Sequence, residues 1–230
     1  NSGETLTSFV PEKSHWMKAD NTIESFKKLR RLPAIAYYFG RDLFGKINVP
    51  VAIMVAASKD NKVESWTLAE TMFDEGQDLP ICYREQAMFN SLIRQFKDIK
   101  IKGVIWYQGE SNVGDGIHYT EKMKRLILSW RSFFQNKQLP FYYAQLPPYQ
   151  YANDTTLLPN FLSAQNKVLQ IPGTGMVVTN DLYEGKKFTI SNKQTLAQRF
   201  ANMALANAYY RVDLPFRYPT MRCFEKNANI

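Results

Sequence analysis

One stretch of the sequence gathers side chains able to bind or catalyse. Residues 108–112, Gln-Gly-Glu-Ser-Asn, place two amides, a carboxylate and a hydroxyl directly after the apolar run of residues 103–107. Groups just beyond the carboxyl end of a strand are well placed to contact a ligand. The same residues also fit a plain strand-to-helix turn, with Asn112 and Asp115 hydrogen-bonded to nearby backbone. Both interpretations remain open at this point.

Ser111 is a weak candidate nucleophile, because it lies outside a Gly-x-Ser-x-Gly turn and has no obvious base beside it. The two histidines are His15, in an early loop, and His118, at the start of a predicted helix. Either could act as a base, but a surface or capping position fits both better. Asp181, just after the last predicted strand, could orient a base, although aspartate there more often caps or turns the chain.

The elements that must position these groups alternate between helix and strand from about residue 33 onward. Apolar residues recur at helical spacing in residues 35–43, 88–96, 119–134, 160–169 and 193–209. Short apolar runs predict strands at residues 49–57, 103–107, 141–146 and 175–179. This order predicts a parallel sheet covered by helices on both faces. Function is then expected in the loops that follow the strands, at residues 58–66, 108–116, 147–154 and 180–192.

Composition excludes several classes of protein. Apolar residues make up 45 % of the 230 residues and aromatic residues 14 %, which is too rich for a disordered chain. The longest apolar runs are strand-length, so no membrane span is expected. The formal charge of +8 is scattered and lacks a nucleic-acid motif, so a solvated basic surface is the better interpretation. Cys82 and Cys223 form no metal-type spacing, and the sequence leaves their pairing open.

Three stretches together resemble the sialate O-acetylesterases, a family within the SGNH hydrolases. The most specific is residues 106–112, Trp-Tyr-Gln-Gly-Glu-Ser-Asn. The others are residues 34–43 leading to 64–67, and residues 130–131 with 139–146. The similarity runs in order over about residues 6–225. It implies a three-layer α/β/α domain with a parallel sheet, the flavodoxin-like SGNH hydrolase fold.

The resemblance also implies an activity, the serine-type removal of O-acetyl groups from sialic acid or related sugars. It implies that Gln108 donates to an oxyanion or a substrate amide, and that Glu110 braces the loop or meets sugar hydroxyls. Ser111 and Asn112 shape the loop, and together with Gly109 the whole segment is expected to contact substrate. An acetylated sugar or sialic acid is therefore the expected ligand, and neither a metal nor a cofactor is expected.

The sequence departs from the family pattern at three places. No Gly-Gln-Ser-Asn element, the usual site of the nucleophile, occurs, and residues 6–11 resemble the family's second strand. Lys59 and Asp60 stand where the family has oxyanion glycines, and a side chain there would crowd the ester. Thr189 stands at the place of the base histidine, and threonine is no base near neutral pH.

These departures predict a partial or degenerate esterase, with a non-catalytic carbohydrate-binding or structural relative as the alternative. Residues 1–215 are expected to form one domain lacking its first strand, and residues 216–230 a tail leading to a further region. A missing N-terminal segment or a second chain could complete the sheet. By resemblance the protein is expected to be secreted, periplasmic or lysosomal, and no nucleic acid is expected as a partner.

Overall fold

The computed structural model describes residues 32–68, 86–151, 154–185, 190–211 and 213–218. Its centre is a parallel sheet in the order β1-β2-β3, formed by β1 (Val104–Trp106), β2 (Phe141–Ala144) and β3 (Thr174–Val177). Ile105 pairs with Tyr142, and Tyr142 pairs with Gly175. Parallel neighbours need a crossover connection, and the helices between the strands supply it.

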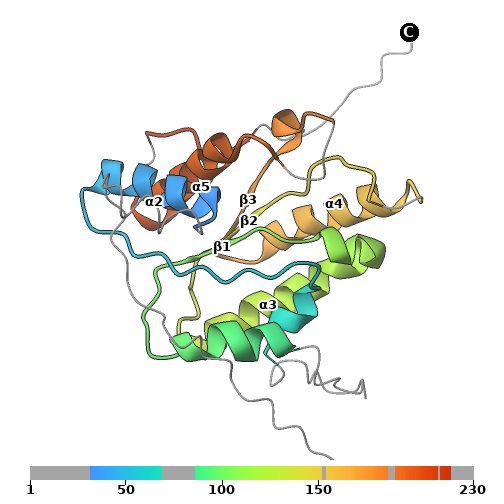
Figure 1. Cartoon of the computed structure of the whole chain (residues 1–230), viewed down its shortest axis with the longest axis horizontal. Coiled ribbons are helices and arrows are strands. Elements are labelled where there is room, and N and C mark those ends of the chain that lie inside the picture. Colours follow the sequence, from blue (N-terminus) through green and yellow to red (C-terminus); the bar gives the residue numbers. More distant parts are fainter. Residues whose placement is uncertain (1–31, 69–85, 152–153, 186–189, 212, 219–230) are drawn as a thin grey trace, which may run out of the picture.

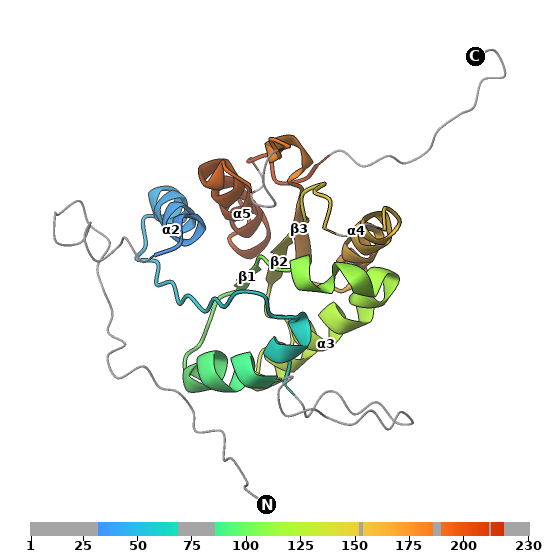
Figure 2. The same cartoon turned by 45° about the vertical axis from the view of Figure 1, so that its right-hand side comes forward.

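Two pairs of helices cover the two faces of this sheet. Helices α2 (Ala34–Ile47) and α5 (Lys193–Ala208) lie side by side on one face, and α3 (Tyr119–Phe133) and α4 (Leu157–Lys167) lie on the other (Figures 1 and 2). The predicted three-layer α/β/α arrangement is therefore confirmed. Short helical turns complete the structure: η1 (Val63–Trp66), η4 (Phe89–Ile93), η5 (Arg94–Phe96), η6 (Glu110–His118), η7 (Val168–Gln170) and η8 (Asn180–Leu182).

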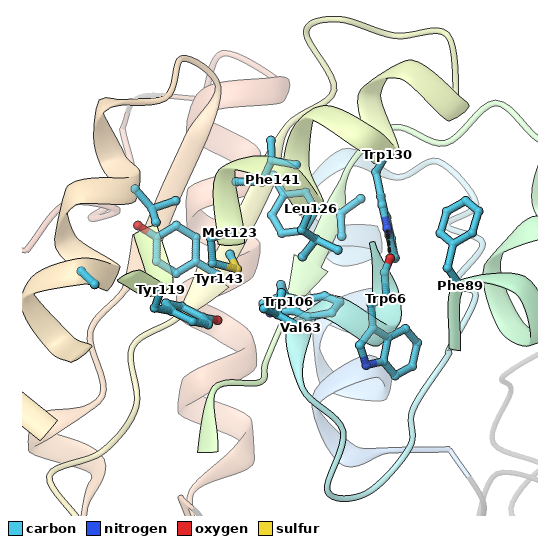
Figure 3. Packing of buried hydrophobic residues seen from close by; sticks show 14 of the residues in the cluster. Val63, Trp66, Phe89, Trp106, Tyr119, Met123, Leu126, Trp130, Phe141 and Tyr143 are labelled. Carbon is cyan, nitrogen blue, oxygen red and sulfur yellow. Dashed lines mark hydrogen bonds between the residues drawn. The ribbon is translucent and has the colours of Figure 1, made fainter. Parts of the chain in front are cut away.

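The larger core lies between the sheet and α3, and it is rich in aromatic rings (Figure 3). Trp106 of β1 meets the rings of Trp66 and Trp130 edge to face, at centroid distances of 5.8 and 6.0 Å. The Trp130 indole donates to the Trp66 carbonyl at 2.8 Å. These contacts attach η1, and therefore the turn that precedes it, to the sheet.

A second, smaller core lies under α5. Leu196, Phe200 and Met203 of that helix pack against Tyr142 of β2 and Val177 of β3. Arg199, from the same helix, donates to the Val178 carbonyl at 2.8 Å, just past the end of β3. The carboxyl end of β3 is thus attached to the helix that covers it.

Most of the predicted elements are confirmed. Helices are present at residues 35–43, 119–133, 160–167 and 193–208, and strands lie within residues 103–107, 141–146 and 174–177. The helix predicted for residues 88–96 is present as a continuous helical segment, but its pitch varies from the wider η4 to the tighter η5.

The strand predicted at residues 49–57 is wrong. These residues run extended from α2 towards η1 and join no ladder of the described sheet (Figure 1). Val49 and Val55 keep 55 % and 42 % of their surface exposed. A central parallel strand would be buried on both faces and paired along its edges, and apolar composition alone cannot supply those partners.

Some expectations fall outside the described residues. They concern residues 6–11, the tail from residue 219 onward, His15, and both cysteines, Cys82 and Cys223. Among the helices that the structure does describe, none combines the length and the apolar character that crossing a bilayer requires.

Candidate functional site

Asn112 anchors the loop of residues 108–118, which follows β1. Its side chain is fully buried, with 0 % exposure. The amide oxygen accepts from the Val63 backbone at 2.9 Å and from Gln108 Nε2 at 2.7 Å. The amide nitrogen donates to Glu64 Oε2 at 3.0 Å and to Asp115 Oδ2 at 2.7 Å. All four bonds that an asparagine amide can form are therefore made within the protein.

A lysine balances the two carboxylates that Asn112 contacts. Lys122 Nζ lies 2.9 Å from Asp115 Oδ2 and also contacts Glu64 Oε1. Partial burial opposes the Asp115 charge, but bonds from Asn112 and Lys122 outweigh it and lower the pKa of Asp115. Partial burial likewise opposes the Lys122 charge, yet the two carboxylates raise the pKa of Lys122. This polar cluster joins η1, η6 and α3 and is internally satisfied.

The interpretation of residues 108–112 as a turn, with Asn112 and Asp115 hydrogen-bonded to nearby backbone, is thus only partly right. Asn112 does bond to Asp115, but through the side chain, and its other partners come from η1. Gln108 is held by the same cluster. Its amide nitrogen donates to Asn112 and, at 3.1 Å, to the Asn61 carbonyl. Its amide oxygen accepts from the Tyr119 hydroxyl at 3.2 Å. To donate to a ligand, Gln108 would have to exchange one of these bonds.

Gly109 brings the loop backbone against α4. It adopts φ +156°, a conformation that residues with a side chain rarely take. A Cβ built there would lie 2.9 Å from Phe161 Cζ and 3.2 Å from Leu146 Cδ1. Phe161 in turn packs on Tyr119, with ring centroids 4.3 Å apart. Glycine is therefore required for this close approach.

Glu110 lies in a different environment from Asn112. Burial raises the pKa of the Glu110 carboxyl, although backbone N–H groups and the positive charge of Lys193 act in the opposite direction. The ammonium of Lys193 lies 5.1 Å from the centre of the Tyr107 ring. Burial lowers the pKa of Lys193, and the nearby Glu110 charge partly offsets this. The carboxylate and the ammonium thus stabilise each other in a poorly solvated place.

Two phenols beside Glu110 complete this second region. Burial, helped by the Glu110 charge, raises the pKa of Tyr107 to about 12. The same causes raise the pKa of Tyr151 above its ordinary range. Both hydroxyl oxygens are buried, and within the described residues neither forms a hydrogen bond of normal geometry, although Tyr107 comes near the Ile190 backbone. Buried polar groups without partners are rare, and they concentrate at functional sites.

Gln165 holds the loop that leaves β2 and carries Tyr151. Its side chain donates to the Ala144 carbonyl at 3.1 Å and accepts from the Leu146 backbone at 2.9 Å. The Tyr143 hydroxyl donates to the Gln165 carbonyl at 2.6 Å. These bonds extend the order of β2 beyond its last ladder pair. They fix the start of residues 147–154, one of the loops expected to carry function.

Between this loop and η6 lies a hollow of about 300 Å³. It is formed by Val113, Pro148, Tyr149, Gln150, Tyr151, Asp154, Thr155, Leu158 and Pro159. We call this set the tyrosine hollow. Its volume is at the lower end of the range for small-molecule sites. The sequence predicted that this loop carries function, but not that its tyrosines and Val113 line one hollow.

The turn at the expected oxyanion position keeps a glycine-like backbone without glycine. Asp60 has φ +57°, in the left-handed region. Asn61 stabilises the turn, because its amide donates to Ser58 Oγ at 2.7 Å and to the Lys59 carbonyl at 2.6 Å. The turn is thus rebuilt around polar side chains.

The remaining candidates lie apart from Glu110 or outside the described residues. Asp181 forms an ion pair with Arg199, whose guanidinium donates to both carboxylate oxygens and lowers the pKa of Asp181. Asp181 therefore attaches the turn after β3 to α5. His118 is exposed at the start of α3, and Ser111 is half-buried in η6. Thr189 lies outside the described residues.

Known proteins resemble this chain in both sequence and fold. The family model for carbohydrate esterases of the sialic acid-specific acetylesterase type matches residues 4–206. The sialate O-acetylesterase of Homo sapiens is 23 % identical over 252 residues, which cover 94 % of this chain and 47 % of that protein. The Mus musculus protein of the same name is 25 % identical over 248 residues, covering 84 % and 46 %. The chain spans about half the length of the curated relatives it matches.

Two solved structures match as well. A carbohydrate acetylesterase from Xanthomonas citri has a TM-score of 0.70 and 27 % identity, covering 79 % of this chain and 42 % of that one. A protein from Arabidopsis thaliana, with a TM-score of 0.56 and 20 % identity, covers 74 % of this chain and 67 % of its own. The predicted SGNH-like hydrolase fold is therefore confirmed.

Proposed function

Because this chain belongs to the sialic acid-specific acetylesterase family of carbohydrate esterases, we propose that it binds O-acetylated sugars without hydrolysing them. The binding place is the carboxyl end of β1 and β2. There Glu110, Lys193 and the two tyrosines offer groups that suit sugar hydroxyls and acetyl carbonyls. Ligands of open parallel sheets bind at this end of the strands.

One observation carries this proposal: the described site holds hydrogen-bonding groups but no histidine. His118 is exposed at the start of α3, and the sequence has Thr189 where the family has its base. A serine hydroxyl needs a base to attack an ester, and the tetrahedral intermediate needs preorganised donors. Lys59 and Asp60 replace the expected glycines, and Gln108 already donates both amide hydrogens to protein acceptors.

Two measurements on the purified 230-residue chain test the proposal. The first follows acetate release from p-nitrophenyl acetate and from an O-acetylated sialic acid, and we expect no release above the uncatalysed background. The second follows binding of the acetylated sugar by calorimetry, and we expect saturation. Turnover that Ser111→Ala or His118→Ala abolishes would overturn the non-hydrolytic assignment, and failure to bind any acetylated sugar would overturn the binding role.

A second candidate, hydrolysis with Glu110 as the base, is favoured by one observation. Burial raises the pKa of Glu110, which brings its carboxyl nearer to the pKa that suits a general base at neutral pH. This candidate predicts a rate that rises with pH through the Glu110 titration and is lost in Glu110→Gln. An unchanged background in both proteins would eliminate it. A secreted, periplasmic or lysosomal location, and completion of the sheet by a further segment or chain, remain predictions of the resemblance.

A further inference from the structure

The tyrosine hollow has the shape and lining of a site for one sugar ring. Its walls are mainly apolar, with Val113 from η6 on one side and Leu158 from α4 on the other. Gln150 and Thr155 add polar groups to the lining. Sugar sites combine these features, because a pyranose has apolar C–H faces and a polar rim of hydroxyls.

The two tyrosines supply a rigid aromatic wall. Tyr149 and Tyr151 meet edge to face, with ring centroids 5.2 Å apart and planes at 73°. Such pairs hold each other in place and present large amphipathic surfaces at little entropic cost. The Tyr151 hydroxyl is buried, and the Glu110 charge acts on it. The aromatic ring is therefore the larger surface that Tyr151 offers to a ligand in the hollow.

The charge around the hollow has one sign. Among the described residues that line it, Asp154 is the charged one, and no lysine or arginine is among them. One Asp154 oxygen, Oδ1, accepts from the Thr156 backbone at 2.8 Å and from the Thr156 hydroxyl at 2.7 Å. The Glu110 charge also acts on Tyr151, but Lys193 offsets it, so the charge of the hollow depends on Asp154. A ligand carboxylate placed here would meet like charge, whereas neutral hydroxyls would meet acceptors.

We propose that the tyrosine hollow binds the ring of a neutral O-acetylated pyranose, and that it rejects acidic sugars. The inference rests on the proposed function and narrows it, because the family description names sialic acid, an anion. The net charge of +8 on the whole chain would favour an anion at long range. At the hollow, the Asp154 carboxylate opposes that preference, because salt screens the more distant charges.

The test compares two sugars that differ in one group. Methyl 4-O-acetyl-α-D-glucopyranoside is neutral, and its uronate carries a carboxylate in place of the C6 hydroxymethyl group. Both are titrated into the full chain in 0.15 M NaCl, and binding is followed by calorimetry or ligand NMR. We expect the neutral sugar to bind about 3- to 5-fold more tightly than the uronate. Equal affinity, or tighter binding of the uronate, would overturn the proposal.

Substitutions locate the binding in the hollow. Asp154→Asn keeps the oxygen that caps Thr156 and removes the charge, so the ratio between the two sugars should fall below about 2-fold. Tyr151→Leu removes the ring and should weaken binding of the neutral sugar about 10-fold. Tyr210→Leu removes a tyrosine that is 85 % exposed elsewhere and serves as the matched control.

Each remaining outcome decides between the two proposals. If Tyr151→Leu fails to fold, Tyr149→Leu removes the partner ring and must weaken binding instead. Unchanged affinity in a folded ring-deleted variant would place the sugar elsewhere and overturn this inference. If the uronate binds saturably and is insensitive to both tyrosines, the proposed function stands and the hollow is not its site. If neither sugar binds, this inference fails, and the proposed function is then decided by the titration with O-acetylated sialic acid.

Discussion

The loop after β1 contains two polar regions that differ in how fully their atoms are hydrogen-bonded. Around Asn112, both amide atoms make two bonds each, and Lys122 balances the carboxylates. Around Glu110, two residues earlier, the buried hydroxyls of Tyr107 and Tyr151 have no described partner. The Asn112 amide has no hydrogen-bonding capacity left for a ligand. The two hydroxyls of the second region keep such capacity, which is why we propose that region, and not the first, as the binding surface.

The two regions also respond to protonation in opposite directions. The Asp115 pKa is lowered, so its charged form stabilises the fold. The Glu110 pKa is raised, so its charged form opposes folding. Substitutions in the first region should therefore lower the free energy of unfolding, whereas comparable substitutions in the second region should not.

Asn112→Ala should have the largest effect. It removes four hydrogen bonds, leaves the Val63 N–H without its acceptor in a buried place, and takes away one of the two acceptors of the Gln108 amide nitrogen. We expect the free energy of unfolding to fall by about 3 kcal/mol or more, measured by urea denaturation. Asn202→Ala, which removes one bond to the Pro215 carbonyl, is the control and should cost less than about 1 kcal/mol. Similar losses in both variants would show that Asn112 contributes no more to stability than Asn202 does.

Asp115→Asn should have an intermediate effect that depends on pH. Because the folded pKa is lowered, the carboxylate's contribution is fully present above the ordinary aspartate pKa of about 3.9 and disappears as pH falls through the folded value. The variant should lose about 1 kcal/mol at pH 7 and converge with the parent in acid. Unfolding curves across pH measure this. Asp98→Asn, at an exposed turn after η5, is the control and should show no such pH-dependent loss.

Glu110→Gln should change stability in the other direction. Because the folded pKa is raised, ionisation costs stability above the folded value, and this cost vanishes as pH falls below the ordinary glutamate pKa of about 4.3. The variant should therefore be more stable than the parent at pH 7, and as stable as the parent in acid. The gain at pH 7 should be smaller than the loss expected for Asp115→Asn. Glu121→Gln, 68 % exposed on α3, is the control. A loss of stability at pH 7 would contradict the contrast.

Tyr107→Phe should have the smallest effect. The hydroxyl it removes has no described bond of normal geometry, so the free energy of unfolding should stay within about 0.5 kcal/mol or rise. Tyr143→Phe removes a 2.6 Å bond to the Gln165 carbonyl and should cost about 1 kcal/mol. Thermal or urea unfolding of the Tyr107→Phe and Tyr143→Phe variants measures this difference in stability. Equal losses would mean that the Tyr107 hydroxyl is paired after all.

Local periodicity was sufficient to predict much of the fold. The apolar face of α3, with Met123, Leu126, Ile127 and Trp130, was visible because helical spacing needs only nearby residues. The same reasoning failed at residues 49–57, since an apolar run becomes a strand only when partners pair with it. The position of the loop at residues 108–112 was also predictable, because it directly follows a strand.

The roles within that loop were not predictable. Asn112 bonds to Val63 and Glu64 across 49 and 48 residues of sequence, and nothing in the local pattern points to those partners. Asp181 looked available for catalysis, but its pairing with Arg199 depends on how α5 docks on β3. The role of Tyr151 was not predictable, because the sequence shows neither that a tyrosine is buried nor that its hydroxyl forms no hydrogen bond. Burial and long-range pairing decide which polar residues are structural.

Gly109 limits which sequences can occupy this loop. Any side chain there would push against Phe161, whose ring rests on Tyr119, the phenol that donates to Gln108. In a saturation library, position 109 should therefore tolerate glycine alone, whereas the half-buried Ser111, two residues later, should accept many replacements. Because Leu146 also lies close and the backbone angle itself favours glycine, shortening residue 161 would relieve only part of the conflict. Position 109 is therefore expected to stay glycine among descendants of this chain.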